Sequence, residues 1–104
     1  MKPDAVNGQL EPLILATVGE ESAHGYAIVQ RLKERSGGAF DLAEGTVYPA
    51  LHRMERDGLL SSSWSIEAGR RRRVYRLTRS GRSTLAERRR EWGSFVRAME
   101  AVLG

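Results

Sequence analysis

Four consecutive arginines, Arg70 to Arg73, stand within the segment EAGRRRRVYRLT, which runs from residue 67 to residue 78. Residues 70–90 hold ten arginines and one acidic residue, whereas residues 1–69 hold ten acidic and six basic residues. The planar guanidinium group matches phosphate oxygens and guanine edges. Such a local concentration of basic charge is typical of a surface that binds a polyanion. From the charge alone, a solvated face that keeps the protein in solution is an equal alternative.

Residue types suited to catalysis or to metal binding are few and scattered. The chain has two histidines, His24 and His52, on different predicted helices, and it has no cysteine. The nearby carboxylates form neither a metal-ligand pattern nor an acid–base pair. We therefore predict a protein that is not an enzyme and that needs no metal or cofactor. His24, beside Gly25 and Tyr26, is expected to pack against its neighbours or to cap a helix start.

Composition limits the size and the location of the protein. The chain has 104 residues, 40% hydrophobic and 29% charged, which suits one compact domain with a modest core. The longest apolar run, Leu13 to Val18, is too short to span a membrane, and there is no signal-peptide pattern. The absence of cysteine fits a reducing compartment. These features predict a cytoplasmic protein with no membrane partner.

The elements that must position the arginines begin with two helices. The first is predicted from Gln9 to about Val18, and Gly19-Glu20-Glu21 is expected to end it. Ser22 is the predicted N-cap of the second helix, which should end at Ser36-Gly37-Gly38 because glycine accepts the left-handed C-cap conformation. Apolar residues recur at helical spacing on one face of this second helix. They are Gly25, Ile28, Val29 and Leu32.

A third helix is predicted from about Glu44 to Asp57, ending at Gly58. Pro49 has no N–H to donate, so the regular part of this helix is expected to begin close to it. One side of the helix should pack inward, through Val47, Ala50, Leu51 and Met54. A mixed, basic face remains on the other side, with Thr46, His52, Arg53 and Arg56.

A β-hairpin is predicted after the third helix. Leu60, Trp64 and Ile66 alternate with polar residues, which indicates a half-buried strand. Ala68-Gly69 should begin a turn that takes in the first arginines. Tyr75 and Leu77 are then expected to face inward, with Val74 and Arg76 on the other face. Three helices followed by a hairpin predict a winged helix-turn-helix, with the arginines at the tip of the wing and DNA phosphates opposite them.

Two long motifs resemble the PadR family of bacterial transcriptional regulators. They are HGYAIVQRLKERSGGAFDLAEGTVYPALHRMERDGLL, residues 24–60, and GRRRRVYRLTRSG, residues 69–81. The resemblance implies a dimeric winged-helix repressor whose third helix enters the major groove of DNA while the wing reaches the flanking backbone. Ala43-Glu44 stands where family members often have Ser-Pro, which removes the usual side-chain N-cap. Val74 replaces a common tyrosine and removes a polar group from the wing.

These patterns lead to a fold that is mainly α with a small β-hairpin, divided into a DNA-binding domain at residues 1–79 and a C-terminal dimerisation helix at residues 80–104. Double-stranded DNA is the predicted partner. The expected contacts of the recognition helix are Thr46, Tyr48, Pro49, His52 and Arg53. The expected contacts of the wing are Arg70, Arg71, Arg72 and Arg73.

The last predicted helix, from about Ser80 to Leu103, carries an apolar stripe at heptad spacing that only Arg88 interrupts. In short PadR-like proteins a single C-terminal helix forms the dimer interface, so the resemblance implies a homodimer held by this stripe. The alternative is that the stripe folds back on its own domain. The predicted interface comprises Leu85, Trp92, Phe95, Val96, Met99, Val102 and Leu103.

Trp92 has two interpretations. It can simply fill the dimer interface, or it can contact a planar aromatic effector, as tryptophans do at the dimer centre of some short PadR-like regulators. Two functions also remain open at this point. One is a repressor that binds a palindromic operator, with small-molecule de-repression. The other is a non-catalytic protein whose winged helix binds another protein and whose arginines keep it in solution.

Overall fold

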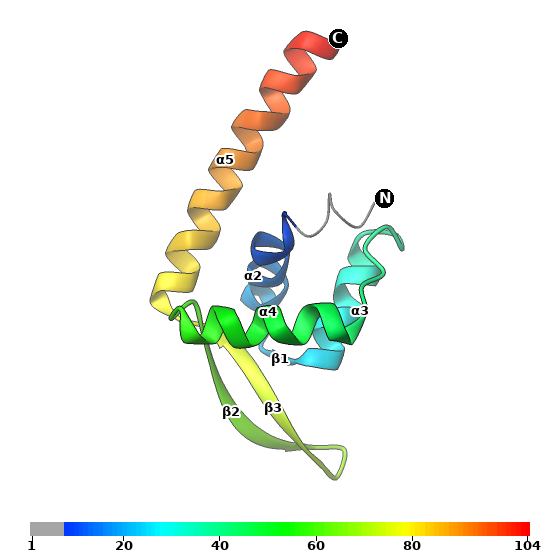
Figure 1. Cartoon of the computed structure of the whole chain (residues 1–104), viewed down its shortest axis with the longest axis vertical. Coiled ribbons are helices and arrows are strands. Elements are labelled where there is room, and N and C mark those ends of the chain that lie inside the picture. Colours follow the sequence, from blue (N-terminus) through cyan, green and yellow to red (C-terminus); the bar gives the residue numbers. More distant parts are fainter. Residues whose placement is uncertain (1–7) are drawn as a thin grey trace.

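The structure, a computed structural model, describes residues 8–104; the first seven residues of the predicted DNA-binding domain lie outside it. Three helices and a three-stranded antiparallel sheet form the body of the molecule, and a long helix leaves it at one end (Figure 1). The sheet order is β1-β3-β2. The elements are α2 (Leu10–Glu20), β1 (Ala23–His24), α3 (Gly25–Arg35), α4 (Glu44–Arg56), β2 (Leu60–Glu67), β3 (Arg70–Leu77) and α5 (Arg79–Leu103).

The two ends of the turn between α2 and α3 differ from their predicted positions. Helix α2 ends at Glu20 with its C-cap at Glu21, so it ends within the predicted Gly19-Glu20-Glu21 segment, two residues later than Val18. Ser22 does not cap α3, because Ala23 and His24 pair with β3 and delay the helix start. His24 is the cap, since its Nδ1 accepts a hydrogen bond from the backbone N–H of Ala27 at 3.2 Å. The predicted capping role of His24 is therefore confirmed.

Helices α3 and α4 bury the faces that their apolar spacing predicts. Helix α3 ends where Gly37 and Gly38 adopt positive φ angles of 62° and 89°, as glycine allows. Helix α4 begins at Glu44, so the prediction that its regular part starts close to Pro49 is wrong. Pro49 costs the helix one hydrogen bond, to the carbonyl of the exposed Gly45, where water can replace it. No side chain caps the helix at Ala43, as its methyl group predicts.

The core lies between α2, α3, α4 and the inner part of the sheet. Its largest fully buried side chains are Tyr75, Ile14, Leu15, Ile28, Leu51 and Met54. The start of α5 belongs to this body, because Gly81 and Leu85 are buried and Leu85 joins the core cluster. A Cβ at Gly81 would collide with the carbonyl oxygen of Leu59. The assignment of Leu85 to an exposed dimer stripe is therefore wrong, since its own chain covers it.

The hairpin turn consists of Ala68 and Gly69 alone, with φ angles of 52° and 75°. Two central residues with positive φ are typical of the tight turns that join two twisted antiparallel strands. All four arginines consequently lie in β3, and the prediction that the turn takes in the first of them is wrong. Arg70 pairs with Glu67 next to the turn, and Arg73 pairs with Trp64.

Trp64 and Ile66 are 54% and 78% exposed, so the prediction that they are half-buried with Leu60 is wrong. The hairpin extends past the helices, on the side opposite the free end of α5, and no layer covers its outer half (Figure 1). Nearer the body, Tyr75 and Leu77 are buried as predicted. Val74 is also buried, next to its partner His24 in β1, but it lies outside the main core cluster.

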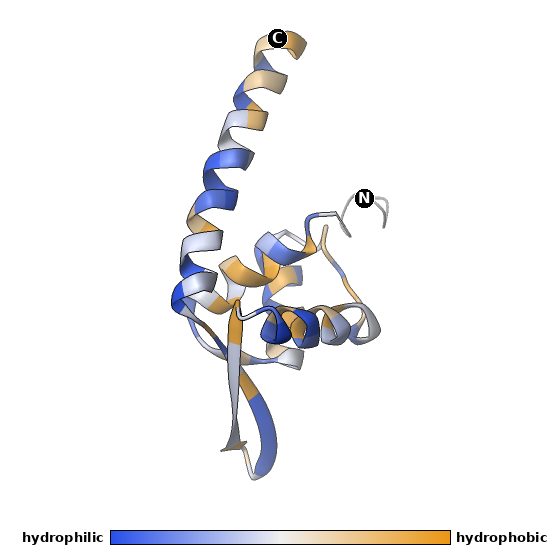
Figure 2. Ribbon diagram, turned by 60° about the vertical axis from the view of Figure 1, so that its left-hand side comes forward, coloured by the Kyte–Doolittle hydropathy of each residue, from blue (hydrophilic) through white to orange (hydrophobic). Residues whose placement is uncertain are grey.

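Helix α5 starts at the N-cap Thr78, whose hydroxyl accepts from Gly81 N and donates to the carbonyl oxygen of Gly58 at 2.6 Å. Arg88 binds Glu11 of α2 at 3.3 Å and Glu91 at 3.2 Å. Beyond Arg88 the helix projects away from the body, and apolar residues recur along it (Figure 2). Across residues 8–104, every helix is too short or too polar to pass through a lipid bilayer.

Candidate nucleic-acid interface

Helix α4 presents a short polar face outward. Its buried side consists of Val47, Ala50, Leu51 and Met54, which leaves Pro49, His52 and Arg53 exposed. Thr46 and Tyr48, the other two predicted contacts, are half-buried. Arg53 lies in the last turn of α4. An exposed arginine on such a helix can donate two hydrogen bonds to the O6 and N7 atoms of guanine.

Tyr48 is held in place by the start of α3. A Cβ added at Gly25 would lie 2.5 Å from the Tyr48 ring, so only glycine lets the ring sit there. The two residues help to line a shallow open pocket of about 210 Å³, together with His24 and the four wing arginines. The pocket therefore joins the N-terminal half of α4 to the wing, with guanidinium groups on one side and a phenol on the other.

The four arginines divide between the two faces of the hairpin. Directly paired residues of antiparallel strands share a face, so Arg73 lies beside Trp64 and Arg71 beside Ile66. The guanidinium carbons of Arg71 and Arg73 lie 4.4 Å and 5.3 Å from the centre of the Trp64 ring. Arg70 and Arg72 point to the opposite face because side chains alternate along a strand. This alternation separates the like charges that are consecutive in the chain.

Arg73 is engaged within the protein. Its Nε donates to Ser62 Oγ at 2.7 Å, and Ser62 Oγ donates to Glu55 Oε2 at 2.6 Å. A second nitrogen of Arg73 lies 3.5 Å from the same carboxylate oxygen. Sequence reasoning missed Glu55, Ser62 and Trp64 as parts of this site. The three come from different elements, and no periodicity of one strand or helix connects them.

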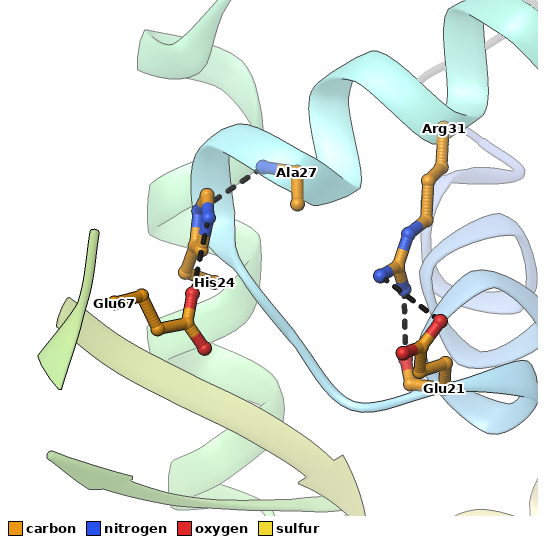
Figure 3. Close-up of polar contacts among 5 residues, drawn as sticks. All are labelled: Glu21, His24, Ala27, Arg31 and Glu67. Atoms are coloured by element: carbon orange, nitrogen blue, oxygen red, sulfur yellow. Dashed lines mark hydrogen bonds and ion pairs between the residues drawn. The ribbon is translucent and has the colours of Figure 1, made fainter. Parts of the chain in front are cut away.

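On the other face, His24 connects the start of α3 to the end of β2. Its Nε2 lies 3.5 Å from a carboxylate oxygen of Glu67, while Nδ1 caps the helix (Figure 3). Burial lowers the pKa of His24, the guanidinium of Arg72 lowers it further, and the Glu67 carboxylate raises it. Arg31, about two turns further along α3, binds both the carbonyl and the carboxylate of Glu21 (Figure 3). The His24–Glu67 contact links the start of α3 to the wing beside its turn, and the Arg31–Glu21 contacts link α3 to the C-cap of α2.

The outer half of α5 exposes a second candidate surface. Trp92 and Phe95 are each 54% exposed, with ring centroids 5.6 Å apart. Met99, Val102 and Leu103 continue the stripe toward the C-terminus and are exposed as well, whereas Val96 is half-buried. An apolar row of this length is unusual on a helix that faces water on all sides. Among residues 8–104 there is no cluster of three potential metal ligands.

Comparisons with known proteins agree with this geometry. Residues 14–87 match the transcriptional regulator PadR-like family. Transcriptional regulator Rv3488 of Mycobacterium tuberculosis is 43% identical over 77 residues, which make up 74% of this chain and 69% of that protein. The crystal structure of a PadR family transcription regulator from Clostridium difficile superposes with a TM-score of 0.81 at 35% identity, covering 90% of this chain and 97% of that one.

One similar structure contains nucleic acid. Bacillus subtilis PadR in complex with operator DNA superposes with a TM-score of 0.68 at 25% identity. The match covers 75% of this chain and 44% of that protein, so more than half of the longer chain lies outside the match. The predicted winged-helix fold and the predicted family are both confirmed. The chain belongs to the PadR-like family of transcriptional regulators.

Proposed function

We propose that this protein is a cytoplasmic repressor that binds a two-fold symmetric operator in double-stranded DNA as a homodimer. The observation that carries the proposal is the pocket that connects the N-terminal half of α4 to the wing arginines. The exposed face of α4, with Pro49, His52 and Arg53, is joined through the Tyr48 pocket to the arginines of β3. The likeness to Bacillus subtilis PadR, which was solved with operator DNA, supports this use of the fold.

In the proposed complex α4 and the wing contact different parts of the DNA. Helix α4 enters the major groove, where the donor and acceptor pattern of each base pair is distinct. Thr46 and Tyr48 lie at the start of this helix and contact the backbone or the base edges beside it. About two to four of the wing arginines in each subunit contact phosphates, which contributes affinity without sequence information.

The proposed dimer uses the outer half of α5. The stripe of Trp92, Phe95, Val96, Met99, Val102 and Leu103 is apolar, and within residues 8–104 all of it is exposed except the half-buried Val96. A second copy of α5 would remove it from water, and two copies of α4 would then face two half-sites one helical turn apart. The proposed functional boundary lies at residue 80, although the first turns of α5 pack on the winged domain.

Selection of bound duplexes from a random-sequence pool tests the proposed function. The recovered sequences should share two inverted half-sites, because a two-fold symmetric dimer reads the same bases twice. Placed upstream of a reporter gene, the recovered site should lower transcription when the protein is present. Recovery of no common sequence would favour the alternative, a winged helix that binds another protein.

Replacing Arg53 by alanine is expected to relax the preference at one base pair of each half-site. A bidentate arginine–guanine contact contributes about 1–3 kcal/mol of discrimination, and the substitution should remove that amount. Binding to a panel of single-base operator variants measures it. Leu51→Ala is the contrasting variant, since Leu51 is fully buried and its truncation should lower the free energy of unfolding by roughly 2–5 kcal/mol. Equal weakening at all base positions after Arg53→Ala would assign Arg53 to the backbone.

A planar aromatic compound is the proposed effector, with Trp92 as its contact. The Trp92 ring is exposed and lies tilted by 30° against Phe95, and its neighbour Gly93 has no side chain. In a symmetric dimer the two indoles would lie near the two-fold axis. A ligand between them would change the spacing of the two α4 helices, to the extent that it binds the DNA-free arrangement more tightly.

Titration of planar cationic dyes against tryptophan emission tests the effector. The chain has two tryptophans, so Trp92→Ala separates the signal of Trp92 from that of Trp64. We expect quenching by at least one dye, abolished in Trp92→Ala, and release of operator DNA at the same dye concentration. Quenching that survives in Trp92→Ala would leave Trp92 as an interface residue alone.

A further inference from the structure

Glu55 links the recognition helix to both strands of the wing. Ser62 of β2 donates to Glu55 Oε2 at 2.6 Å, and Arg73 of β3 donates to Ser62 at 2.7 Å while also lying 3.5 Å from the carboxylate. The Glu55 side chain is 30% exposed, so water competes with these contacts only in part. A shared carboxylate, hydroxyl and guanidinium hold a fixed geometry better than an isolated surface ion pair does.

The same contacts make Arg73 different from the other three arginines. Within residues 8–104, Arg73 is the one of the four that has a carboxylate oxygen at ion-pair distance. Its guanidinium also lies over Trp64. Arg71 has the contact with Trp64 and no such carboxylate. A cation already paired with a carboxylate releases few counterions from DNA, so Arg73 should add little to phosphate binding.

We propose that Glu55 is a positioning residue that keeps Arg73 off the DNA and fixes the wing relative to α4. The inference rests on the proposed function. A wing held at one angle can reach phosphates only when α4 sits in its correct register, so affinity for random sequence stays low. A free wing with one more free cation would bind random duplexes more tightly and would discriminate less. Glu55 would thus raise specificity by limiting non-specific affinity.

Glu55→Gln is the central variant, because glutamine has the same size and lacks the charge. In both subunits it should release Arg73, so that random duplex DNA binds at least fivefold more tightly. The slope of log affinity against log salt should become steeper by about 0.9 per released arginine. The operator-to-random ratio should fall by a similar factor. A purely structural role of Glu55 would weaken binding to both DNAs instead.

Two further variants make the result specific to Arg73. In the double variant Glu55→Gln with Arg73→Ala the released cation is gone. Its affinity for random DNA should therefore return to within about twofold of the wild-type value, and its salt slope to within about 0.3. Asp57→Asn removes a negative charge two residues away, at the C-cap of the same helix, and should leave the slope unchanged. The inference is overturned if Glu55→Gln gives no gain, or if Arg73→Ala alone flattens the slope as much as Arg71→Ala.

A measurement on the free protein separates this inference from the proposed function. In a Trp92→Phe background Trp64 is the one emitting tryptophan. Glu55→Gln should raise the acrylamide quenching constant of Trp64 measurably, because the released Arg73 no longer covers the indole. An unchanged constant would refute the link, whatever the protein does with DNA. Failure of the wild type to bind any duplex, with the quenching change present, would refute the proposed function and the specificity role together but leave the link established.

Discussion

Replacing both Phe95 and Met99 by glutamate is expected to convert the proposed dimer into a monomer that no longer holds its operator. In one chain these side chains are 54% and 43% exposed, on the part of α5 that projects from the body. A dimer along α5 would bury them against a second copy, and an unpaired buried carboxylate costs several kcal/mol. The free-energy cost of burying two such carboxylates in each subunit is larger than the favourable free energy that an interface of this length contributes. Loss of the second α4 then removes half of the base contacts.

Sedimentation equilibrium at micromolar concentration measures the change in mass. Arg97→Glu with Ala101→Glu is the matched control, because it places two glutamates on the opposite side of the same exposed segment. That control should remain a dimer with the same helix content. A wild-type protein that sediments as a monomer at micromolar concentration would contradict the proposed interface, as would a dimer that survives the Phe95 and Met99 substitutions.

Replacing both Arg71 and Arg72 by alanine is expected to weaken operator and random DNA alike. The change removes four cations from a dimer, and four phosphate contacts correspond to roughly 10²–10³-fold in affinity near physiological salt. The two arginines lie on opposite faces of β3, so they report on both sides of the wing. The salt slope should become shallower by about 0.9 for each phosphate that no longer meets an arginine.

Electrophoretic or fluorescence titrations at several salt concentrations measure both quantities. Arg97→Ala is the control, since Arg97 is exposed on α5, far along the chain from the wing. It should leave both the affinity and the slope within about twofold of wild type. If operator binding fell while random binding held, the wing would be reading bases, and its assignment to phosphates would be wrong.

The helical part of the fold could be predicted because each helix buries one face. The apolar spacing of α3 and α4 identifies the residues that the structure buries, and glycines mark where both helices end. Residue spacing within one helix gave a wrong prediction where a face could be covered by either of two surfaces. Leu85 fits the same heptad as Phe95, yet Leu85 packs on its own core, and a heptad does not say which surface will cover it.

The hairpin shows the same limit in a strand. Alternation predicts a strand at Leu60–Ile66, but it does not show how much of that strand the helices cover. They do not cover Trp64 and Ile66, which are therefore exposed. The residues that contact each other in the site are further apart in the sequence. Glu55 and Arg73 meet only after two strands have paired, so no spacing within one element could have indicated them. The four arginines were visible as a charge cluster, whereas their division between two faces depended on where the turn lies.

Binding of the wild-type protein to its selected site and to random duplex, followed from 50 to 200 mM salt, tests sequence-specific DNA binding most directly. For 6–10 phosphate contacts, both affinities should fall by about 10³–10⁵-fold over this range. The ratio between them should change far less, because base contacts release few counterions. Affinities that do not respond to salt, or a selected site that binds no better than random sequence at any salt concentration, would contradict a winged-helix regulator that reads DNA through α4 and grips it through the wing.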